Sequence, residues 1–409
     1  MTDIIQNHKA ADAIIIGGGL SGCATAYFLS KGGLRVLIIE RRNIASGASG
    51  RNGSCITKMD SRTLTSARVR KRLPYVLASL ELLKSLEIEL ETDFDLQQFG
   101  AIDIASSENE IDEILEMVRN QSDGGDEKVE FLEREGILSK LPLVGESAIA
   151  AKYTETDGSL DPIKLTCSLA RTAYNKYNID ILSNTKVIRL IKKRNKITGI
   201  LTDKGFVNID CLIINCTNAW LNDFEQEIPI FPVKSIVSVT EKTAPLPLIT
   251  WESNHLGFYA YGTSQKKGNL LVGTLPVKIP NGPFGHFDES VDYEDLKRHG
   301  MLLHTLFPKI SEISIIRTWA GVFCMTPDRL PYVGPLPGFD NYFINAGYSN
   351  GMCYCPVGSF LLSEYILNNR KTSIPIDVLD PGRFYNQKFE LPQSYNYDIL
   401  ERYLGEWDL

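Results

Sequence analysis

The sequence lacks several features that would place it in other classes of protein. It has no apolar run near the roughly 20 residues of a membrane-spanning helix. Its first ten residues, MTDIIQNHKA, show no basic region followed by an apolar stretch, as a secretory signal would. Positive charge is in deficit, because 43 Lys and Arg face 50 Asp and Glu, and the net charge of -7 argues against nucleic acid or an anionic membrane as partner. We therefore expect a cytoplasmic protein without a membrane span that acts on a small molecule.

Metal-binding patterns are also scarce. The eight cysteines are scattered, and most lie in apolar strand or helix patterns, where a reduced thiol behaves as a small hydrophobic side chain. Cys353 and Cys355 form a close pair, but no second pair stands at a metal-binding spacing. We expect no metal site, and the sequence assigns no role to these two cysteines.

The length and composition indicate a globular protein of two domains. A chain of 409 residues is too long for one compact core, because single cores stop growing near roughly 250 to 300 residues. Hydrophobic residues make up 43% and charged residues 23%, so the core should be substantial.

A βαβ unit is predicted at the start of the chain. The apolar run at 13–16 has the pattern of a parallel strand buried on both faces, 20–30 is typical of a helix, and 34–39 predicts a second strand. Further helices are expected at 68–89, 108–120, 162–176 and 356–368, and further strands at 186–192, 197–202, 206–210, 211–215 and 342–346. The strands at 211–215 and 342–346 should return the chain to the parallel sheet.

The turn after the first strand has the spacing Gly17-x-Gly19-x-x-Gly22. Gly17 permits a tight turn, Gly19 lets the backbone approach a pyrophosphate, and Gly22 lets the helix pack against the strand. The helix N-terminus offers free N–H groups to phosphates, and Glu40, at the end of the second strand, can accept hydrogen bonds from a ribose diol. A plain glycine-rich turn is disfavoured because strand, helix and acid are all in register. The sequence predicts a dinucleotide site.

The loop after the second strand points to one dinucleotide. Residues 46–54, SGASGRNGS, resemble the A-S-G-R-N-G-G segment of the D-amino-acid oxidase superfamily of FAD-dependent oxidoreductases, which includes glycine oxidase, sarcosine oxidase and the proline dehydrogenases. The resemblance extends along nearly the whole chain. Other segments similar to family motifs are 157–162 (DGSLDP), 184–187, 319–321 (WAG), 326–334 (TPDRLPYVG) and 347–352 (GYSNGM).

The resemblance implies FAD as the cofactor and indicates its contacts by position. The matching positions are Gly17, Gly19, Gly22, Glu40, Ser49, Arg51, Asn52, Val187, Gly321, Asn350, Gly351 and Met352. For Arg51 the alternative is a solvated surface charge, and for the downstream glycines it is a plain turn. Asn218 stands where the family usually has glycine, a mild departure because asparagine tolerates a positive φ better than other non-glycine residues.

Three departures from the family pattern bear on activity. Phe323 stands where the resemblance places an arginine that holds the substrate carboxylate. The lysine that activates oxygen in the sarcosine oxidases is absent from 352–355 (MCYC), which favours a dehydrogenase over a fast oxidase. Gly321 stands where monomeric sarcosine oxidases attach their flavin to a cysteine, and Cys324 comes three residues later, so we expect non-covalent FAD.

The substrate face is expected from the segment at 229–280, which is rich in β-branched and aromatic residues and predicts an antiparallel sheet. Tyr259 and Tyr261 should point to one face, where their hydroxyls could orient an amine or carboxylate, although ordinary sheet aromatics are an equal alternative. His255 could be a base or a carboxylate partner, with a surface histidine as the alternative. Arg317 is a candidate anion partner, with a strand-end charge as the alternative.

The predicted fold is α/β: a doubly wound, Rossmann-like FAD-binding domain with an antiparallel-sheet α+β substrate domain. The expected division is 1–85, 150–225 and 310–384 for the FAD-binding domain, 86–149 and 226–309 for the substrate domain, and 385–409 for a C-terminal extension. The resemblance implies oxidation of the C–N bond of a small amine or amino acid, by hydride transfer to the flavin and hydrolysis of the imine. It leaves the substrate and the electron acceptor open.

Two other activities remain open on the sequence, a flavoenzyme of the same fold acting on a C–OH bond and a non-catalytic flavoprotein subunit. A homo- or hetero-oligomer is expected, since length and motifs resemble the catalytic subunits of heteromeric sarcosine oxidase and dye-linked proline dehydrogenase. The extension holds six aromatic residues among 25, too many for a solvated tail, and 398–404 has helical character. It should dock on its own chain or on a partner.

Overall fold

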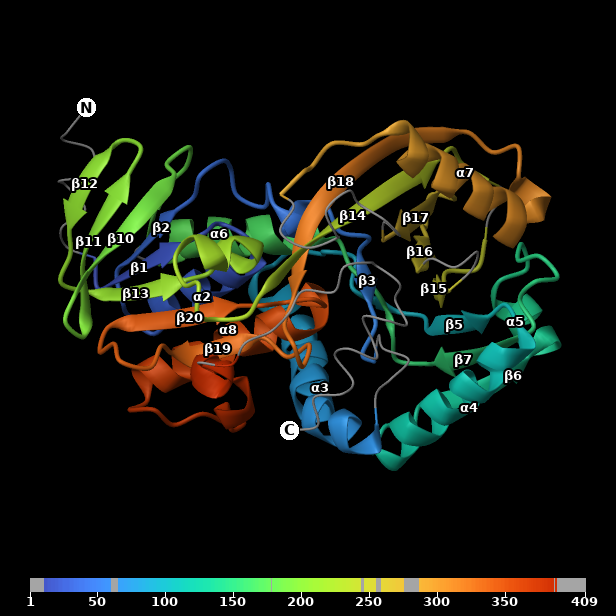
Figure 1. Cartoon of the computed structure of the whole chain (residues 1–409), viewed down its shortest axis with the longest axis horizontal. Coiled ribbons are helices and arrows are strands. Elements are labelled where there is room, and N and C mark those ends of the chain that lie inside the picture. The colour runs from blue at the N-terminus through green and yellow to red at the C-terminus, as the bar shows by residue number, and fades with distance from the viewer. Residues whose placement is uncertain are drawn as a thin grey trace.

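Two large β-sheets organise the chain within the residues that the computed structural model describes (Figure 1). Those residues are 11–59, 65–177, 179–243, 246–254, 259–275, 287–385 and 387. One sheet has six strands and the other has eight. The long strands β14 and β18 belong to the larger sheet, and they extend into it from the centre of the molecule, where the two sheets meet (Figure 1).

The six-stranded sheet is formed mainly by short, wholly apolar strands. Its strands, in spatial order, are β19 (Tyr332–Pro335), β20 (Tyr342–Ala346), β13 (Leu212–Asn215), β1 (Ala13–Ile16), β2 (Val36–Ile39) and β9 (Ile179–Leu182). All pair in parallel except β19, which runs antiparallel to β20. The predicted βαβ unit is confirmed, and so is the return of β13 and β20 to this sheet.

Both faces of the six-stranded sheet are covered, which explains why its strands are apolar on both sides. Along β1, Ala13 and Ile15 pack towards the helices, whereas Ile14 and Ile16 pack towards a three-stranded sheet. The helices are α2 (Leu20–Lys31), α3 (Ser66–Glu89), α6 (Pro162–Lys176) and α8 (Gly351–Leu367), and the small sheet is β10 (Val187–Lys193), β11 (Lys196–Thr202) and β12 (Gly205–Asn208). The α/β class is therefore as predicted, but a β-meander covers the second face where a doubly wound fold has helices.

The eight-stranded sheet is antiparallel except for the parallel pair β15 and β5. Its strands, in spatial order, are β18 (Ile315–Met325), β14 (Phe231–Thr240), β17 (Leu270–Thr274), β16 (Ala260–Ser264), β15 (Thr250–Ser253), β5 (Ala101–Ala105), β7 (Ala150–Thr154) and β6 (Val129–Glu133). Helices α5 (Arg134–Lys140) and α7 (Tyr293–Leu306) share a core with one face of this sheet. Helix α4 (Glu108–Asp123) packs beside β5 and β7.

Two strands lie in a different sheet from the one that the expected domain boundaries imply. Strands β7 and β18 lie in the larger sheet, whereas the sequence predicts that 150–225 and 310–384 belong to the FAD-binding domain. Long-range pairing decides this, because Ala151 pairs with Ile104 and Gly321 with Ser235. The division into two domains stays a prediction.

Helix α8 begins five residues before its predicted start at Pro356. Pro356 is compatible with helix here because it lies within the first two turns, where few backbone N–H groups have a partner four residues earlier. The structure extends the helix back to Gly351 because Met352, Cys353 and Cys355 are all buried in the core shared with α2. The N-terminus of α8 is thereby moved to the loop after β20.

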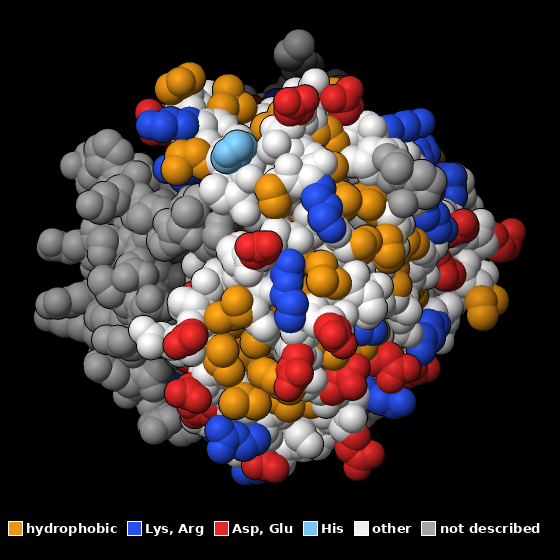
Figure 2. Space-filling view, turned by 90° about the vertical axis from the view of Figure 1, so that its right-hand side faces the viewer, with side chains coloured by type: hydrophobic (Ala, Val, Ile, Leu, Met, Phe, Trp, Pro, Cys, Tyr) orange, Lys and Arg blue, Asp and Glu red, His pale blue; other side chains and the backbone are white. Residues whose placement is uncertain are grey.

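Shorter elements complete the described chain. They are β3 (Cys55–Ile56), β4 (Gln97–Gln98) and β8 (Gly158–Ser159), which form a small sheet, and the 3-10 turns η1 (Ala48–Gly50), η2 (Asn218–Asp223), η4 (Pro308–Ile310), η5 (Asp377–Leu379) and η6 (Pro381–Phe384). No helix in the described ranges is long and apolar enough to cross a membrane. Figure 2 shows the end of the molecule opposite the β10–β12 meander, where basic and acidic side chains alternate with small hydrophobic groups on the described surface. The helix predicted at 398–404 lies outside the described residues.

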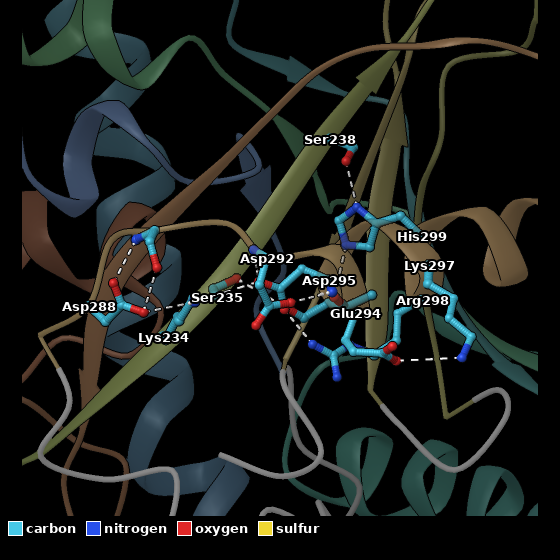
Figure 3. Close-up of polar contacts among 12 residues, drawn as sticks. Lys234, Ser235, Ser238, Asp288, Asp292, Glu294, Asp295, Lys297, Arg298 and His299 are labelled. Carbon is cyan, nitrogen blue, oxygen red and sulfur yellow. Dashed lines mark hydrogen bonds and ion pairs between the residues drawn. The ribbon is translucent and has the colours of Figure 1, made fainter. Parts of the chain in front are cut away.

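Helix α7 is held on β14 by buried polar contacts (Figure 3). His299, fully buried, has Nδ1 at 2.6 Å from Ser238 Oγ and Nε2 at 2.8 Å from Thr274 Oγ1. Nearby, Lys234 lies 3.2 Å from Asp288 and 3.5 Å from Asp295. Burial lowers the pKa of His299 to about 3, with the Arg298 charge as a lesser cause, so the imidazole is neutral between its two hydroxyl partners.

The neutral His299 is expected to make stability depend on pH. Its pKa is lower in the folded chain than the ordinary 6.5, so the unfolded chain takes up a proton that the folded chain does not. The contribution of His299 to the free energy of unfolding should be fully present above about pH 6.5. It should fall towards pH 3, by at most about 1.4 kcal/mol per pH unit. Denaturant unfolding between pH 4.5 and 8 would measure this against His299→Gln, which does not titrate. Parallel pH profiles for the two proteins would contradict the assignment.

Candidate cofactor and active site

A cavity of about 300 Å³ lies between the two large sheets. Its lining comes from the carboxyl ends of β1, β2 and β13, from the loop after β2, from the start of α8, and from β14, β16 and β18 of the larger sheet. In open α/β sheets ligands bind at the carboxyl ends of the strands. The cavity therefore lies where the glycine motif predicted a dinucleotide.

The glycine turn between β1 and α2 leaves no room for side chains. Gly17 has a φ of +109°, and a Cβ there would lie 2.8 Å from the Cys216 carbonyl oxygen. A Cβ on Gly22 would lie 1.9 Å from the Gly17 oxygen, so Gly22 sets the approach of α2 to the turn and does not itself line the cavity. Gly17 and Gly19 do line it. The N-terminus of α2 is thereby brought to the cavity wall, where its N–H groups can bind phosphate.

Glu40 follows β2 and lines the cavity while only 8% exposed. Its Oε2 accepts a 2.7 Å hydrogen bond from Gly18 N, and its Oε1 accepts a 2.7 Å bond from Arg42 N. Each carboxylate oxygen has a second lone pair. The side chain is therefore fixed in the orientation in which it can also accept hydrogen bonds from a ribose diol.

A basic and aromatic group lies next to Glu40. The Arg41 guanidinium lies 3.8 Å from the centre of the Trp220 ring, which stacks on Phe287. Burial lowers the pKa of Arg41, and the Arg42 charge adds to this. Val187, which begins β10, lines the cavity together with Arg41 and Trp220. The sequence did not single out Arg41, Arg42 or Trp220, although the two arginines follow Glu40 directly.

The loop predicted to surround FAD is held together by its own side chains. The Asn52 amide donates to the carbonyls of Ala48 and Ser49, and its Oδ1 accepts from Ser54 N at 2.8 Å. Ser49 Oγ accepts from Leu20 N at 2.8 Å, which ties the loop to the first turn of α2. Ser49, Arg51 and Asn52 all line the cavity.

Arg51 is not the solvated surface charge that the sequence left open. Its Nη1 donates to Ala320 O at 2.9 Å and lies 3.2 Å from Glu289 Oε2, and its carbonyl accepts from Trp319 Nε1. Arg42 also pairs with Glu289, at 2.7 Å. Burial acts to raise the pKa of Glu289, but Arg42 and Arg51 outweigh it and hold that pKa below its usual value. Two arginines of the cavity wall thus share one carboxylate.

The late glycine segment reaches the cavity through the start of α8. Asn350 stands at the N-cap position of α8, although its side chain makes no capping hydrogen bond. Asn350, Gly351 and Met352 line the cavity with Ser349. The Asn350 amide donates to the carbonyl of Thr57, the residue after β3, which joins the start of α8 to the end of that strand. Gly321, on β18, lies on the cavity wall against Arg51.

The two predicted tyrosines form part of the ceiling of the cavity. Tyr259 and Tyr261 lie on one face of the larger sheet, with ring centres 5.9 Å apart, and both line the cavity. The Tyr261 ring lies over Gly273, where a Cβ would be 2.2 Å from the ring, and against Gly53 of the loop at 46–54. Its hydroxyl is 2.9 Å from Ser235 Oγ. Burial raises the pKa of Tyr261, which keeps the phenol protonated as a hydrogen-bond donor.

The sheet register also brings an acidic residue that the sequence did not reveal. Glu252 pairs with Tyr261 across β15 and β16, and with Asp103 across β15 and β5, so these side chains share a face. Glu252 is 6% exposed and lines the cavity. A strand of alternating residues gives no sign of this role, because only the pairing partner shows which face meets the cavity.

One of the proposed catalytic residues, Arg317, is not brought to the cavity. Arg317 is exposed on β18, 5.7 Å from the Trp319 ring, and is absent from the cavity lining. Its side chain lies over an aromatic ring at the edge of the sheet, so Arg317 is a charge near the end of a strand and not a group of the cavity wall. His255 lies outside the described residues. Phe323 does line the cavity, so the position expected of a carboxylate-binding arginine presents an apolar ring.

The glycine turn, the buried acid after the second strand and the helix N-terminus at one cavity wall define a dinucleotide-binding protein with a second sheet closing its site. The chain belongs to the FAD dependent oxidoreductase (DAO) family, whose model matches residues 12–365. FAD is thus its cofactor, and the glycine turn, Glu40 and the α2 N-terminus fit its ribose and diphosphate.

Several relatives resemble the chain over most of its length. It is 27% identical over 395 residues to sarcosine oxidase subunit beta of Arthrobacter sp, covering 90% of this chain and 93% of that protein. It is 27% identical over 400 residues to mitochondrial dimethylglycine dehydrogenase of Rattus norvegicus, covering 91% of this chain but only 45% of that longer protein. Among solved structures, L-proline dehydrogenase from P. horikoshii is 29% identical with a TM-score of 0.78, covering 92% of this chain and 98% of that one.

Proposed function

We propose that this chain binds FAD non-covalently and oxidises the C–N bond of a small amine or amino acid, with secondary amines as the preferred class. The observation that carries the proposal is that one cavity joins the dinucleotide turn at Gly17 and Glu40 to the tyrosine face at Tyr259 and Tyr261. Sarcosine, dimethylglycine and proline, which name three of the relatives, are all amino acids whose nitrogen carries a further carbon substituent.

The residues of the cavity would divide the work between cofactor and substrate. Bound FAD would accept two electrons as a hydride from the carbon next to the substrate nitrogen, leaving an imine for water to hydrolyse. Tyr261 would donate from its phenol, Tyr259 and Phe323 would enclose the substrate, and the two sheets would exclude water. The remaining predicted positions, from Ser49 to Met352, would hold the cofactor.

Non-covalent binding is supported by the placement of Cys324. Its thiol is fully buried and lies 3.2 Å from Asn218 Oδ1, and Cys324 is absent from the cavity lining. Gly321 takes the wall position instead. Attachment of flavin to Cys324 would therefore require β18 to move.

The electron acceptor in this proposal is a molecule other than oxygen. The start of α8, where the resemblance implies a lysine, is buried and carries Met352, Cys353, Tyr354 and Cys355. The same proposal includes a cytoplasmic location and assembly into an oligomer, either of identical chains or with a different subunit. The assembly is supported by the relative from Arthrobacter sp, which is described as a subunit of sarcosine oxidase.

Anaerobic flavin bleaching tests the reaction class. The holoprotein would be mixed with sarcosine, L-proline, glycine and 2-hydroxy acids of matched size, and the flavin absorbance followed. We expect bleaching by a secondary amine, flavin release on acid precipitation, and turnover at least about tenfold faster with an artificial acceptor than with oxygen.

Each other outcome has a defined meaning. Bleaching by hydroxy acids alone would replace the proposal with C–OH oxidation. A flavin that dithionite reduces but no substrate bleaches would indicate a non-catalytic subunit. Equal turnover with both acceptors would refute the acceptor proposal and leave the substrate class standing.

A further inference from the structure

Asn218 joins two strands at the carboxyl edge of the six-stranded sheet. It begins η2, three residues after the last residue of β13, and its φ is +48°. Strands β13 and β20 pair in parallel, with Asn215 opposite Ile344, so their carboxyl ends lie side by side. The turn that follows β20 therefore meets the start of η2 at the cavity wall.

Three donors converge on the side-chain oxygen of Asn218. Oδ1 accepts from Gly347 N and from Tyr348 N, both at 2.9 Å, and the Cys324 thiol lies 3.2 Å away. The amide nitrogen of Asn218 lies 3.5 Å from the Tyr348 carbonyl. Two successive backbone N–H groups of one turn thus take a single side chain as their acceptor. Buried backbone donors need partners, so this acceptor determines the conformation of the turn.

The turn in question leads directly to the predicted FAD contacts. Gly347 has a φ of +86°, and a Cβ there would lie 2.8 Å from Thr326, so the chain has little room for another path. Tyr348 and Ser349 line the cavity, and Asn350, Gly351 and Met352 follow them into α8. A shift at Gly347 and Tyr348 would displace the start of α8 and its N–H groups.

We propose that Asn218 is a positioning residue that fixes the turn at Gly347 and Tyr348 and thereby sets FAD affinity. The side-chain acceptor, rather than the positive φ alone, carries this role. The proposal rests on the proposed function only in that FAD occupies this cavity. It also changes the meaning of the residue at position 218, because asparagine there supplies a contact that the glycine of the family pattern has no side chain to make.

Three variants separate the side chain from the backbone. Asn218→Gly keeps the positive φ and removes the acceptor, Asn218→Ala removes the acceptor and strains the backbone, and Asn218→Asp keeps an acceptor oxygen. Flavin fluorescence quenching on the apoprotein would give the FAD dissociation constant of each. We expect at least about tenfold weaker binding for the glycine variant, which corresponds to about 1.4 kcal/mol, and tighter binding for the aspartate variant than for the glycine variant.

A readout without FAD completes the test. Hydrogen exchange of a peptide spanning 345–350 in the apoproteins should be faster for Asn218→Gly and restored by Asn218→Asp. Wild-type affinity and exchange in the glycine variant would overturn the positioning role while leaving FAD binding intact. Failure of the wild-type chain to bind FAD would instead refute the proposed function.

Discussion

Replacing Gly22 by alanine is expected to abolish FAD retention and to destabilise the fold by about 3 kcal/mol, near the upper end of ordinary overpacking. The new Cβ would lie 1.9 Å from the Gly17 carbonyl oxygen, a backbone atom that no side-chain rotation can remove. Helix α2 would have to move away from β1, and its N-terminus would leave the phosphate position. The flavin content of the purified protein and its denaturant midpoint would measure both effects.

Gly300 provides a matched control, because it is also a helical glycine. A Cβ at Gly300 in α7 would meet nothing within 4 Å. Gly300→Ala should therefore retain FAD and be neutral or more stable by up to about 1 kcal/mol, since alanine favours helix. Full flavin content in Gly22→Ala would show that α2 can adjust, and that the close approach does not set the site.

Replacing Glu40 by alanine is expected to weaken FAD binding by about 1.5 to 3 kcal/mol, which is roughly 10- to 150-fold. The substitution removes the predicted ribose partner. It also leaves Gly18 N and Arg42 N, now 2.7 Å from the carboxylate, without their acceptor. The FAD dissociation constant of the reconstituted apoprotein is the measurement.

Glu81 is a suitable control for loss of a glutamate. It is a surface residue whose side chain is 73% exposed and pairs with Lys84 within α3. Exposed ion pairs of this kind contribute little, so Glu81→Ala should leave the FAD affinity unchanged. An equal loss in both variants would point to a general charge effect and contradict the role of Glu40 as a specific ligand.

Much of the cofactor site could be predicted because its parts are close together in the sequence. The strand at 13–16, the three glycines, the helix and Glu40 all lie within 28 residues, and each has a local pattern with one physical meaning. The loop at 46–54 follows directly, and its Asn52 side chain is hydrogen-bonded to the loop's own backbone. The local geometry of the turn and of the loop could therefore be predicted without knowledge of the rest of the chain.

The substrate side could be predicted only in part. Alternation along one strand indicates that Tyr259 and Tyr261 share a face, and they do. It does not indicate which face meets the cavity. The charge of Arg317 beside Trp319 suggests an anion partner, but Arg317 lies at the exposed end of β18. The sequence does not reveal Glu252 as a cavity residue. Its position depends on pairing with Tyr261 of β16 and Asp103 of β5, and these strands meet β15 only in the folded sheet.

The sequence by itself determined the dinucleotide turn, the acid that follows the second strand and, through the family motifs, the cofactor. Those features depend on short-range geometry and hydrogen bonds between near neighbours. The tertiary structure alone decided that β10–β12 cover the second face of the sheet, that Glu252 enters the cavity, and that Asn218 binds the turn at Gly347, 129 residues away. The physical reason is that long-range pairing of strands, which no local pattern specifies, sets which side chains meet.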